Sequence, residues 1–158
     1  MTAWNPLTKF IVTHPFNEPE VRSLLPHIDE LTDSGSSPLH FAALQNDPSF
    51  VMILVSSGAE VNTPNYYLET PLHWAVKEGH QEVVTLLLTL GARVDILDMD
   101  QDSPLDWAIQ EGQSHLLPLL KTNQKKSNHR SISQRLGRLI SPRLLLSPRL
   151  RSRASVTL

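Results

Sequence analysis

Hydrophobic runs of two forms alternate along the chain between residues 36 and 120. The first form is two polar residues, Pro-Leu, a polar residue, an aromatic residue and alanine. It occurs as SSPLHFA from Ser36, ETPLHWA from Glu69 and DSPLDWA from Asp102. The second form is longer and more apolar, as in FVMILVSSGAEVN (Phe50–Asn62) and VVTLLLTLGARVD (Val83–Asp95). Each first run, with the more apolar run that follows it, predicts a pair of helices.

Residues that typically begin and end helices flank these runs. A hydroxyl residue that can accept from the first free N–H groups precedes each short run: Ser37, Thr70 and Ser103. Proline comes next every time, and its missing N–H costs nothing at the first helical position. We expect the first helices to end near Asn46, Gly79 and Gly112, and the second helices to end at Gly58 and Gly91, where glycine readily becomes left-handed.

The whole unit repeats with a spacing of 33 residues, which is the strongest signal in the sequence. Four columns recur at this spacing: Pro38, Pro71 and Pro104; Leu39, Leu72 and Leu105; Phe41, Trp74 and Trp107; Ala42, Ala75 and Ala108. One helix pair cannot bury its apolar face alone, but stacked copies can share an elongated core. The spacing therefore predicts an all-α solenoid.

The phrase TPLHWA (Thr70–Ala75), followed by a Gly-His turn and the VVTLLLTLGARVD helix, resembles the ankyrin repeat. The resemblance covers residues 32–122 as three repeats and implies an ankyrin-repeat solenoid of helix pairs with hairpin-like loops. The first repeat has Asn46 in place of the usual glycine. The third has Asp106 in place of histidine and Pro118 inside its second helix. Terminal repeats are expected to be atypical because one of their faces meets water.

The residues before the repeats carry a weaker form of the same pattern. HIDELTD (His27–Asp33) aligns with EVNTPNY at an offset of 33, and VRSLL before it resembles a shortened second helix. We therefore predict that residues 1–31 form a degenerate N-terminal cap repeat.

The resemblance implies that loop tips and the exposed side of each first helix form a concave binding face. On this chain, that face holds Asp33, Ser34, Ser36, Leu44, Gln45, Tyr66, Tyr67, Glu69, Lys77, Glu78, Met99, Asp100, Asp102, Gln110 and Glu111. The set is acidic and includes two adjacent tyrosines. Tyrosine offers a large contact area at low entropic cost, and acidic residues select basic partners. We expect this face to bind another protein, and we expect the chain to be a monomer.

The repeated histidines and aromatic residues have a structural interpretation. His40 and His73 lack converging catalytic or metal-binding partners, and the resemblance implies that they connect helix to loop through hydrogen bonds. Phe41, Trp74 and Trp107 could provide binding anchors. We favour their packing between adjacent repeats.

No catalytic pattern is found. Cysteine is absent and the six glycines form no phosphate-binding loop. Asp98, Asp100 and Asp102 alternate as in a calcium loop, but Ser103 and Ile109 stand where that loop needs glycine and a bidentate glutamate. We therefore expect no enzyme activity, metal or cofactor.

The net charge of −2 conceals two oppositely charged parts. Residues 1–120 hold all sixteen acidic residues and four basic ones, a net charge of −12, and residues 121–158 carry ten basic residues and no acid. We interpret residues 123–158 as a basic, disordered tail. Two alternatives remain open for the tail. It could contact nucleic acid, anionic lipid or an import receptor through Lys125, Lys126, Arg130, Arg135 and Arg138, or it could shield the acidic face.

Two functions therefore remain open. The first is a non-catalytic binding module, such as a small inhibitor, adaptor or host-directed effector. The second is an adaptor whose tail binds nucleic acid or an anionic membrane while the repeats act as a rigid carrier. No secretory signal or long apolar run is present, so we expect a protein of the cytoplasm or nucleus.

Overall fold

The computed structural model describes residues 6–13, 19 and 23–124, which fold as stacked helices. Three helices begin at the repeated proline: α3 (Pro38–Leu44), α5 (Pro71–Lys77) and α7 (Pro104–Gln110). Each is followed by a second helix. These are α4 (Pro48–Ser56), α6 (Gln81–Thr89), and a 3-10 turn, η2 (Ser114–Leu116), that leads into helical residues 117–124. The all-α solenoid predicted from the 33-residue spacing is confirmed.

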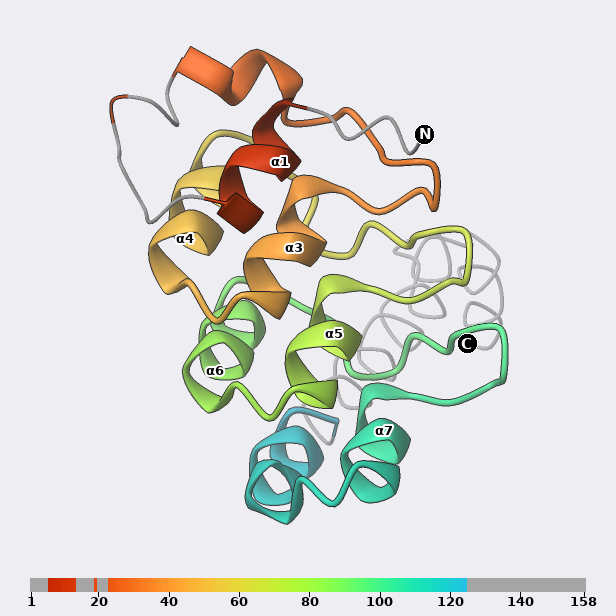
Figure 1. The fold of residues 1–158 in the computed structure, drawn as a ribbon. Coiled ribbons are helices and arrows are strands. Elements are labelled where there is room, and N and C mark those ends of the chain that lie inside the picture. The colour runs from red at the N-terminus through yellow and green to blue at the C-terminus, as the bar shows by residue number, and fades with distance from the viewer. Residues whose placement is uncertain (1–5, 14–18, 20–22, 125–158) are drawn as a thin grey trace, which may run out of the picture. The chain divides into compact units, whose positions relative to one another are not determined.

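Like helices pack against like along the stack. α3 packs against α5 and α5 against α7, while α4 packs against α6. Figure 1 shows α3, α5 and α7 in one row, with α4 and α6 on one side of it and the long loops on the other. The core is a run of small and aliphatic side chains at matching positions, including fully buried Leu39, Leu72, Ala42, Ala75 and Ala108. Small residues in these columns allow neighbouring helices to approach closely.

The residues before the first clear repeat contribute a further helix. α1 (Pro6–Thr13) packs against α3, as α3 packs against α5, and a 3-10 turn, η1 (Leu25–His27), follows later in the chain. Leu7 and Ile11 of α1 are buried, and the ring of Phe10 meets that of Phe50 edge to face at 6.2 Å. Asn5-Pro6-Leu7 repeats Ser37-Pro38-Leu39 at an offset of 32, a match that the 33-residue alignment does not register. Helix α1 thus packs on the first clear repeat, and the degenerate cap repeat over residues 1–31 stays a prediction.

Glycine or a residue with positive φ stands at the same turn position in each repeat. Gly35, Leu68 and Gln101 are 33 residues apart, with φ angles of 73°, 60° and 67°. Only glycine adopts this left-handed region without strain. Two of the three turns therefore retain the backbone shape but not the residue that favours it.

A candidate protein-binding surface

Three tight turns between the repeats build the surface that the sequence singled out. They span residues 32–36, 65–69 and 98–102, and in each the first backbone N–H donates to the last carbonyl at 2.9 to 3.0 Å. The N–H of Tyr66 donates to the Ser34 carbonyl and that of Met99 to the Tyr67 carbonyl, both at 3.0 Å. Each turn is thus fixed beside the next one.

A side chain inside each of the last two turns holds the turn closed. Asp98 is buried, and its Oδ1 accepts from the N–H groups of Asp100 and Asp102 at 3.0 and 2.9 Å. Asn65 does the same with the N–H groups of Tyr67 and Glu69. These oxygens satisfy backbone donors that the turn would otherwise leave unpaired.

The two indoles of the aromatic row are also held by carboxylates. Trp107 Nε1 donates to Asp98 Oδ2 at 2.8 Å, and Trp74 Nε1 donates to Glu69 Oε2 at 2.8 Å. In the second repeat, Asn65 cannot both close the turn and accept from the indole. Its Nδ2 instead donates to the same Glu69 oxygen at 2.7 Å. Asn65 and Glu69 together therefore make the turn and indole contacts that Asp98 makes alone.

The buried histidines connect each first helix to the next turn. His40 Nδ1 accepts from the Ser37 N–H at 3.1 Å, so its proton lies on Nε2, which donates to the Glu69 carbonyl at 3.0 Å. His73 repeats this between Thr70 and the Asp102 carbonyl. Burial lowers the pKa of His40 from 6.5 to about 4, and burial also lowers the pKa of His73. These contacts confirm the structural role predicted for both histidines.

Asp106 replaces the histidine in the third repeat and makes only the local contacts. Its Oδ2 accepts from the Ser103 N–H at 2.9 Å and from the Ser103 hydroxyl at 2.5 Å, and these hydrogen bonds lower its pKa. A carboxylate has no proton with which to reach a carbonyl beyond its own repeat.

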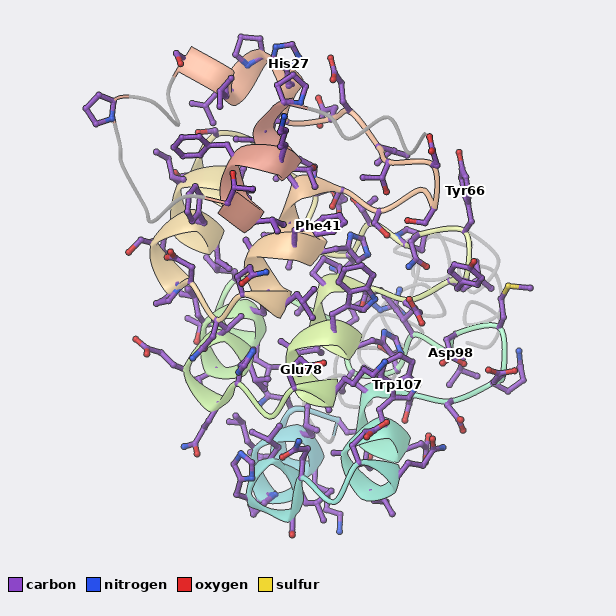
Figure 2. The ribbon with its side chains drawn as sticks, viewed as in Figure 1. His27, Phe41, Tyr66, Glu78, Asp98 and Trp107 are labelled. Carbon is purple, nitrogen blue, oxygen red and sulfur yellow. The ribbon has the colours of Figure 1, made fainter. Side chains whose placement is uncertain are left out.

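The aromatic row packs between repeats, as predicted. The rings of Phe41 and Trp74 meet edge to face at 5.3 Å, and His40 and Trp74 do so at 5.2 Å. His73 and Trp107 form the equivalent contact one repeat later, at 5.5 Å. The two indoles remain half-buried, so one part of each ring contributes to the surface. Figure 2 shows Trp107 and Asp98 where α7 meets its turn.

The tips of the second and third turns expose a group of large apolar side chains. Tyr66 is 67 % exposed, Tyr67 58 % and Met99 61 %, and Leu68 between them is also exposed. The hydrogen bond between Met99 and Tyr67 places the two tips next to each other, and Figure 2 shows Tyr66 at the outer end of its loop. We call Tyr66, Tyr67, Leu68 and Met99 the turn-tip patch. Sequence reasoning did not select Leu68, although it stands at the turn position that Gly35 occupies.

The remaining predicted residues divide into two groups. Asp33, Ser34, Glu69, Asp100 and Asp102 lie in the turns, whereas the other group lies at or just past the C-terminal ends of α3, α5 and α7: Leu44, Gln45, Lys77, Glu78, Gln110 and Glu111. Two side-chain contacts link the groups to neighbouring elements. Gln110 Nε2 donates to Asp102 Oδ2 at 2.7 Å, and Lys77 Nζ lies 5.6 Å from the centre of the Trp107 ring.

Exposure separates the residues that are free to meet a partner from those used inside the fold. Ser34, Leu44, Glu69 and Asp102 are half-buried, and the Ser34 hydroxyl is hydrogen-bonded to those of Thr32 and Ser36. Ser36, which the sequence placed on the same face, is fully buried, and that expectation was wrong. The exposed acids of the predicted set are Asp33, Glu78, Asp100 and Glu111.

The remaining predictions concern the basic tail, metal binding and membrane spans. The predicted tail contacts, Lys125, Lys126, Arg130, Arg135 and Arg138, lie outside the described residues. Within the described part of the chain, no group of histidine and acidic residues could hold a metal ion. Nor is any described helix long and apolar enough to cross a membrane.

The stacked helix pairs and hydrogen-bonded turns define a helical repeat protein. The family model described as Ankyrin repeat matches residues 34–66, and the one described as Ankyrin repeats (3 copies) matches residues 67–131. The chain belongs to the ankyrin repeat family. No curated protein matches it significantly. Ankyrin repeats generally mediate contacts between proteins, and such domains are typically non-catalytic.

Proposed function

We propose that this chain is a non-catalytic module that binds another protein through the turn-tip patch and the acidic residues around it. The observation that supports this most directly is the exposure of three large side chains, Tyr66, Tyr67 and Met99, on rigidly connected turns. Aromatic residues and methionine are enriched at protein interfaces and supply large contact areas. Rigid turns reduce the conformational entropy lost on binding.

Charge around the patch favours a basic partner. Asp33 and Asp100 lie on the turns beside the patch, and Glu78 and Glu111 lie at the ends of the first helices, all exposed. Lys77 is the basic residue of the predicted set, and its ammonium group stacks on Trp107. Complementary charge accelerates encounter and excludes acidic competitors. The proposed partner surface therefore combines an apolar anchor with lysine or arginine.

Substitution of the tyrosine pair tests this function. We expect Tyr66→Ala with Tyr67→Ala to weaken partner binding at least tenfold, because central aromatic anchors supply most of the energy of an interface. The partner would be captured with the full chain, purified, and titrated by calorimetry. Thermal unfolding should change little because both side chains are exposed.

A matched control distinguishes this patch from a general surface effect. Met52 and Thr85 are exposed side chains of the groove between α4 and α6, on the side of the stack away from the turns. Met52→Ala with Thr85→Ala should leave the affinity unchanged. Equal losses in the two double variants would contradict a binding role for the turn-tip patch.

The alternative function, in which the tail binds nucleic acid or an anionic membrane, is supported by the ten basic residues of residues 121–158. Salt separates the two functions. Binding of a basic tail to an anionic polymer weakens steeply as salt rises, because counterions are released. A complex with apolar anchors loses less affinity between low and physiological salt. Titration of a duplex oligonucleotide and of the captured partner at two salt concentrations would show which behaviour applies.

A further inference from the structure

Large apolar side chains are concentrated on the loops between the repeats. Among the described residues, eight large hydrophobic side chains are exposed, and six of them lie on these loops rather than on helices. Four of the six form the turn-tip patch. The other two, Leu31 and Leu97, are 45 % and 43 % exposed, and Pro64, which occupies the same position of the middle repeat, is also exposed. We call Leu31, Pro64 and Leu97 the loop ridge.

The loop ridge lies on the same side of the loops as the tips of the turn-tip patch. Leu97 and Met99 are exposed, and the residue between them is buried. Pro64 and Tyr66 show the same alternation. It is typical of extended chain, in which side chains two residues apart point the same way. Because hydrogen bonds join each turn to the next, two adjacent columns of mostly apolar side chains run along the stack.

We propose that the loop ridge binds an amphipathic helix of the partner protein, with basic residues beside the apolar stripe of that helix. This inference rests on the proposed function and extends the binding surface from the turn tips to Leu31, Pro64 and Leu97. The spacing of the columns, the width of the surface and the charge of the loops each support a helix of this composition.

The spacing along the stack matches a helix. Since α3 packs on α5 and α5 on α7, equivalent residues of successive repeats are about 10 Å apart, the usual distance between packed helices. Residues i and i+7 of an α-helix lie on one face about 10.5 Å apart. Side chains on one face of an extended strand are instead about 6.6 or about 13 Å apart. A helix along the loops can therefore place one apolar residue over each repeat.

The width of the surface also favours a helix. Apolar residues at i, i+3, i+4 and i+7 form a stripe wide enough to contact two adjacent columns of side chains together. Leu31 and Leu97 would meet one edge of this stripe, and Tyr66 and Met99 would meet the other. The partner helix would thereby bury large side chains that the repeats leave exposed.

Charge selects a basic helix. The three loops, residues 28–36, 61–69 and 94–102, hold eight acidic residues and no lysine or arginine. Asp29, Asp33 and Asp100 are exposed beside the two columns. Lysine and arginine at the edges of the apolar stripe would pair with these carboxylates, whereas an acidic helix would be repelled.

Three synthetic peptides of about five helical turns provide the probe. The first has leucine at i, i+3, i+4 and i+7 with lysine and arginine at the flanks, and the second has the same composition in scrambled order. We expect the first to bind the full chain at least tenfold more tightly in calorimetric titrations, because only an ordered stripe contacts both columns. Its circular dichroism should show helix formation on binding. The third carries a central proline and should bind weakly, because proline breaks the helix.

Variants of the full chain locate the binding site. Leu31→Ser with Leu97→Ser should weaken binding of the first peptide at least tenfold, because it removes anchors of the loop ridge. Met52→Ala with Thr85→Ala, on the side of the stack away from the loops, should leave it unchanged. Melting temperatures identify any variant that loses its fold. In the unchanged chain, amide chemical shifts of the three loops should move on addition of the first peptide, while those of α4 and α6 should not.

Three kinds of result would overturn the inference. Equal affinity for the first and the scrambled peptide would mean that charge alone attracts them. Equal affinity for the proline peptide would assign an extended partner. Unmoved loop shifts, or full affinity of the folded serine variant, would exclude the loop ridge from the site.

The proposed function is judged separately, with the captured partner. If Tyr66→Ala with Tyr67→Ala weakens capture of the partner and Leu31→Ser with Leu97→Ser does not, the turn-tip patch stands and the loop ridge does not. If the helical peptide requires the loop ridge while the partner ignores the tyrosines, the loop ridge stands and the binding role of the tyrosines fails.

Discussion

At two turn tips, the backbone conformation favours glycine but the chain has a residue with a side chain. Leu68 and Gln101 hold a left-handed conformation that favours glycine, yet both lie at exposed turn tips. Gly35 shows the alternative. A Cβ added there would lie 2.5 Å from Cδ1 of Tyr66, so this glycine gives the tyrosine ring its place. The same position of the repeat therefore has different roles in different turns.

Relief of this backbone strain should stabilise the protein. We expect Gln101→Gly to raise the free energy of unfolding by about 0.5 to 1 kcal/mol, the left-handed penalty less the extra entropy of glycine in the unfolded chain. Urea denaturation followed by circular dichroism measures this. Gly35→Ala is the opposite control and should destabilise the chain, because its methyl group meets Tyr66. A destabilised Gln101→Gly variant would show that the glutamine side chain contributes more than its backbone costs.

The histidines make stability depend on pH. The folded-state pKa of His40 is lowered from 6.5 to about 4, so the unfolded chain binds more protons between these values. Stability is therefore complete above pH 6.5 and falls as pH decreases toward 4, by about 3 kcal/mol for this residue. Melting temperatures measured between pH 7 and 4.5 should follow this trend.

A variant that lacks His40 tests whether this residue is the source of that pH dependence. His40→Asn should be less stable than the natural chain at pH 7, because it loses the bond to the Glu69 carbonyl. Its stability should vary less steeply between pH 6.5 and 4.5. An unchanged slope would assign the pH dependence to other groups.

At the scale of elements, the turns and first helices are joined by carboxylate–indole hydrogen bonds. The third repeat uses Asp98 to hold both its turn and Trp107, whereas the second divides these tasks between Asn65 and Glu69. Both arrangements leave the indole N–H satisfied. The longer glutamate is needed because it starts from the other end of the turn.

Replacing the Asp98 arrangement of the third repeat with the Asn65 and Glu69 arrangement of the second tests whether the two are equivalent. Asp98→Asn should destabilise the protein by about 1 to 3 kcal/mol, because the amide cannot hold the turn and also accept from Trp107 Nε1. Addition of Asp102→Glu should restore part of the loss by recreating the arrangement of the second repeat. Asp102→Glu alone serves as the control. Absence of rescue would mean that the two repeats position their turns differently. Chemical denaturation provides the measurement.

At the scale of the whole molecule, the described helices and core lie within one compact unit, residues 1–127. The stack gains stability mainly from contacts between neighbouring repeats, as solenoids do. All sixteen acidic residues lie in this unit, and half of the fourteen basic residues follow it in the chain.

We expect a chain that ends at Ser127 to remain folded, because the described core does not include later residues. Its far-ultraviolet circular dichroism should retain the helical signal, and it should unfold cooperatively. Loss of the helical signal would show that residues beyond 127 are required for the stack itself.

Much of the fold could be predicted because the residues that recur at a fixed spacing are those that pack one repeat against the next. The Pro-Leu and Ala columns recur at 33 residues, since each copy must fit the next, and the structure buries Leu39, Leu72 and Ala75 accordingly. The N-terminal helix was not located in the sequence because its match is offset by 32. The aromatic row was assigned to packing correctly because its members share one column.

The site was predictable only in outline. The sequence indicated which loops face outward, and Tyr66, Tyr67 and Met99 are indeed exposed. It could not show that Glu69 is bound by an indole, that Ser36 is buried, or that Leu68 extends the patch. These features depend on which atoms the turns bring within hydrogen-bonding distance.

The sequence by itself determined the repeating unit, the helix ends and the division of charge, because these depend on local propensity and on a period visible in one dimension. Only the tertiary structure decided which acidic residues are occupied inside the fold and which remain free for a partner. It alone revealed that Ile109 is exposed where Val76 is buried. Burial depends on the neighbour in space, and the last repeat has no described neighbour beyond it.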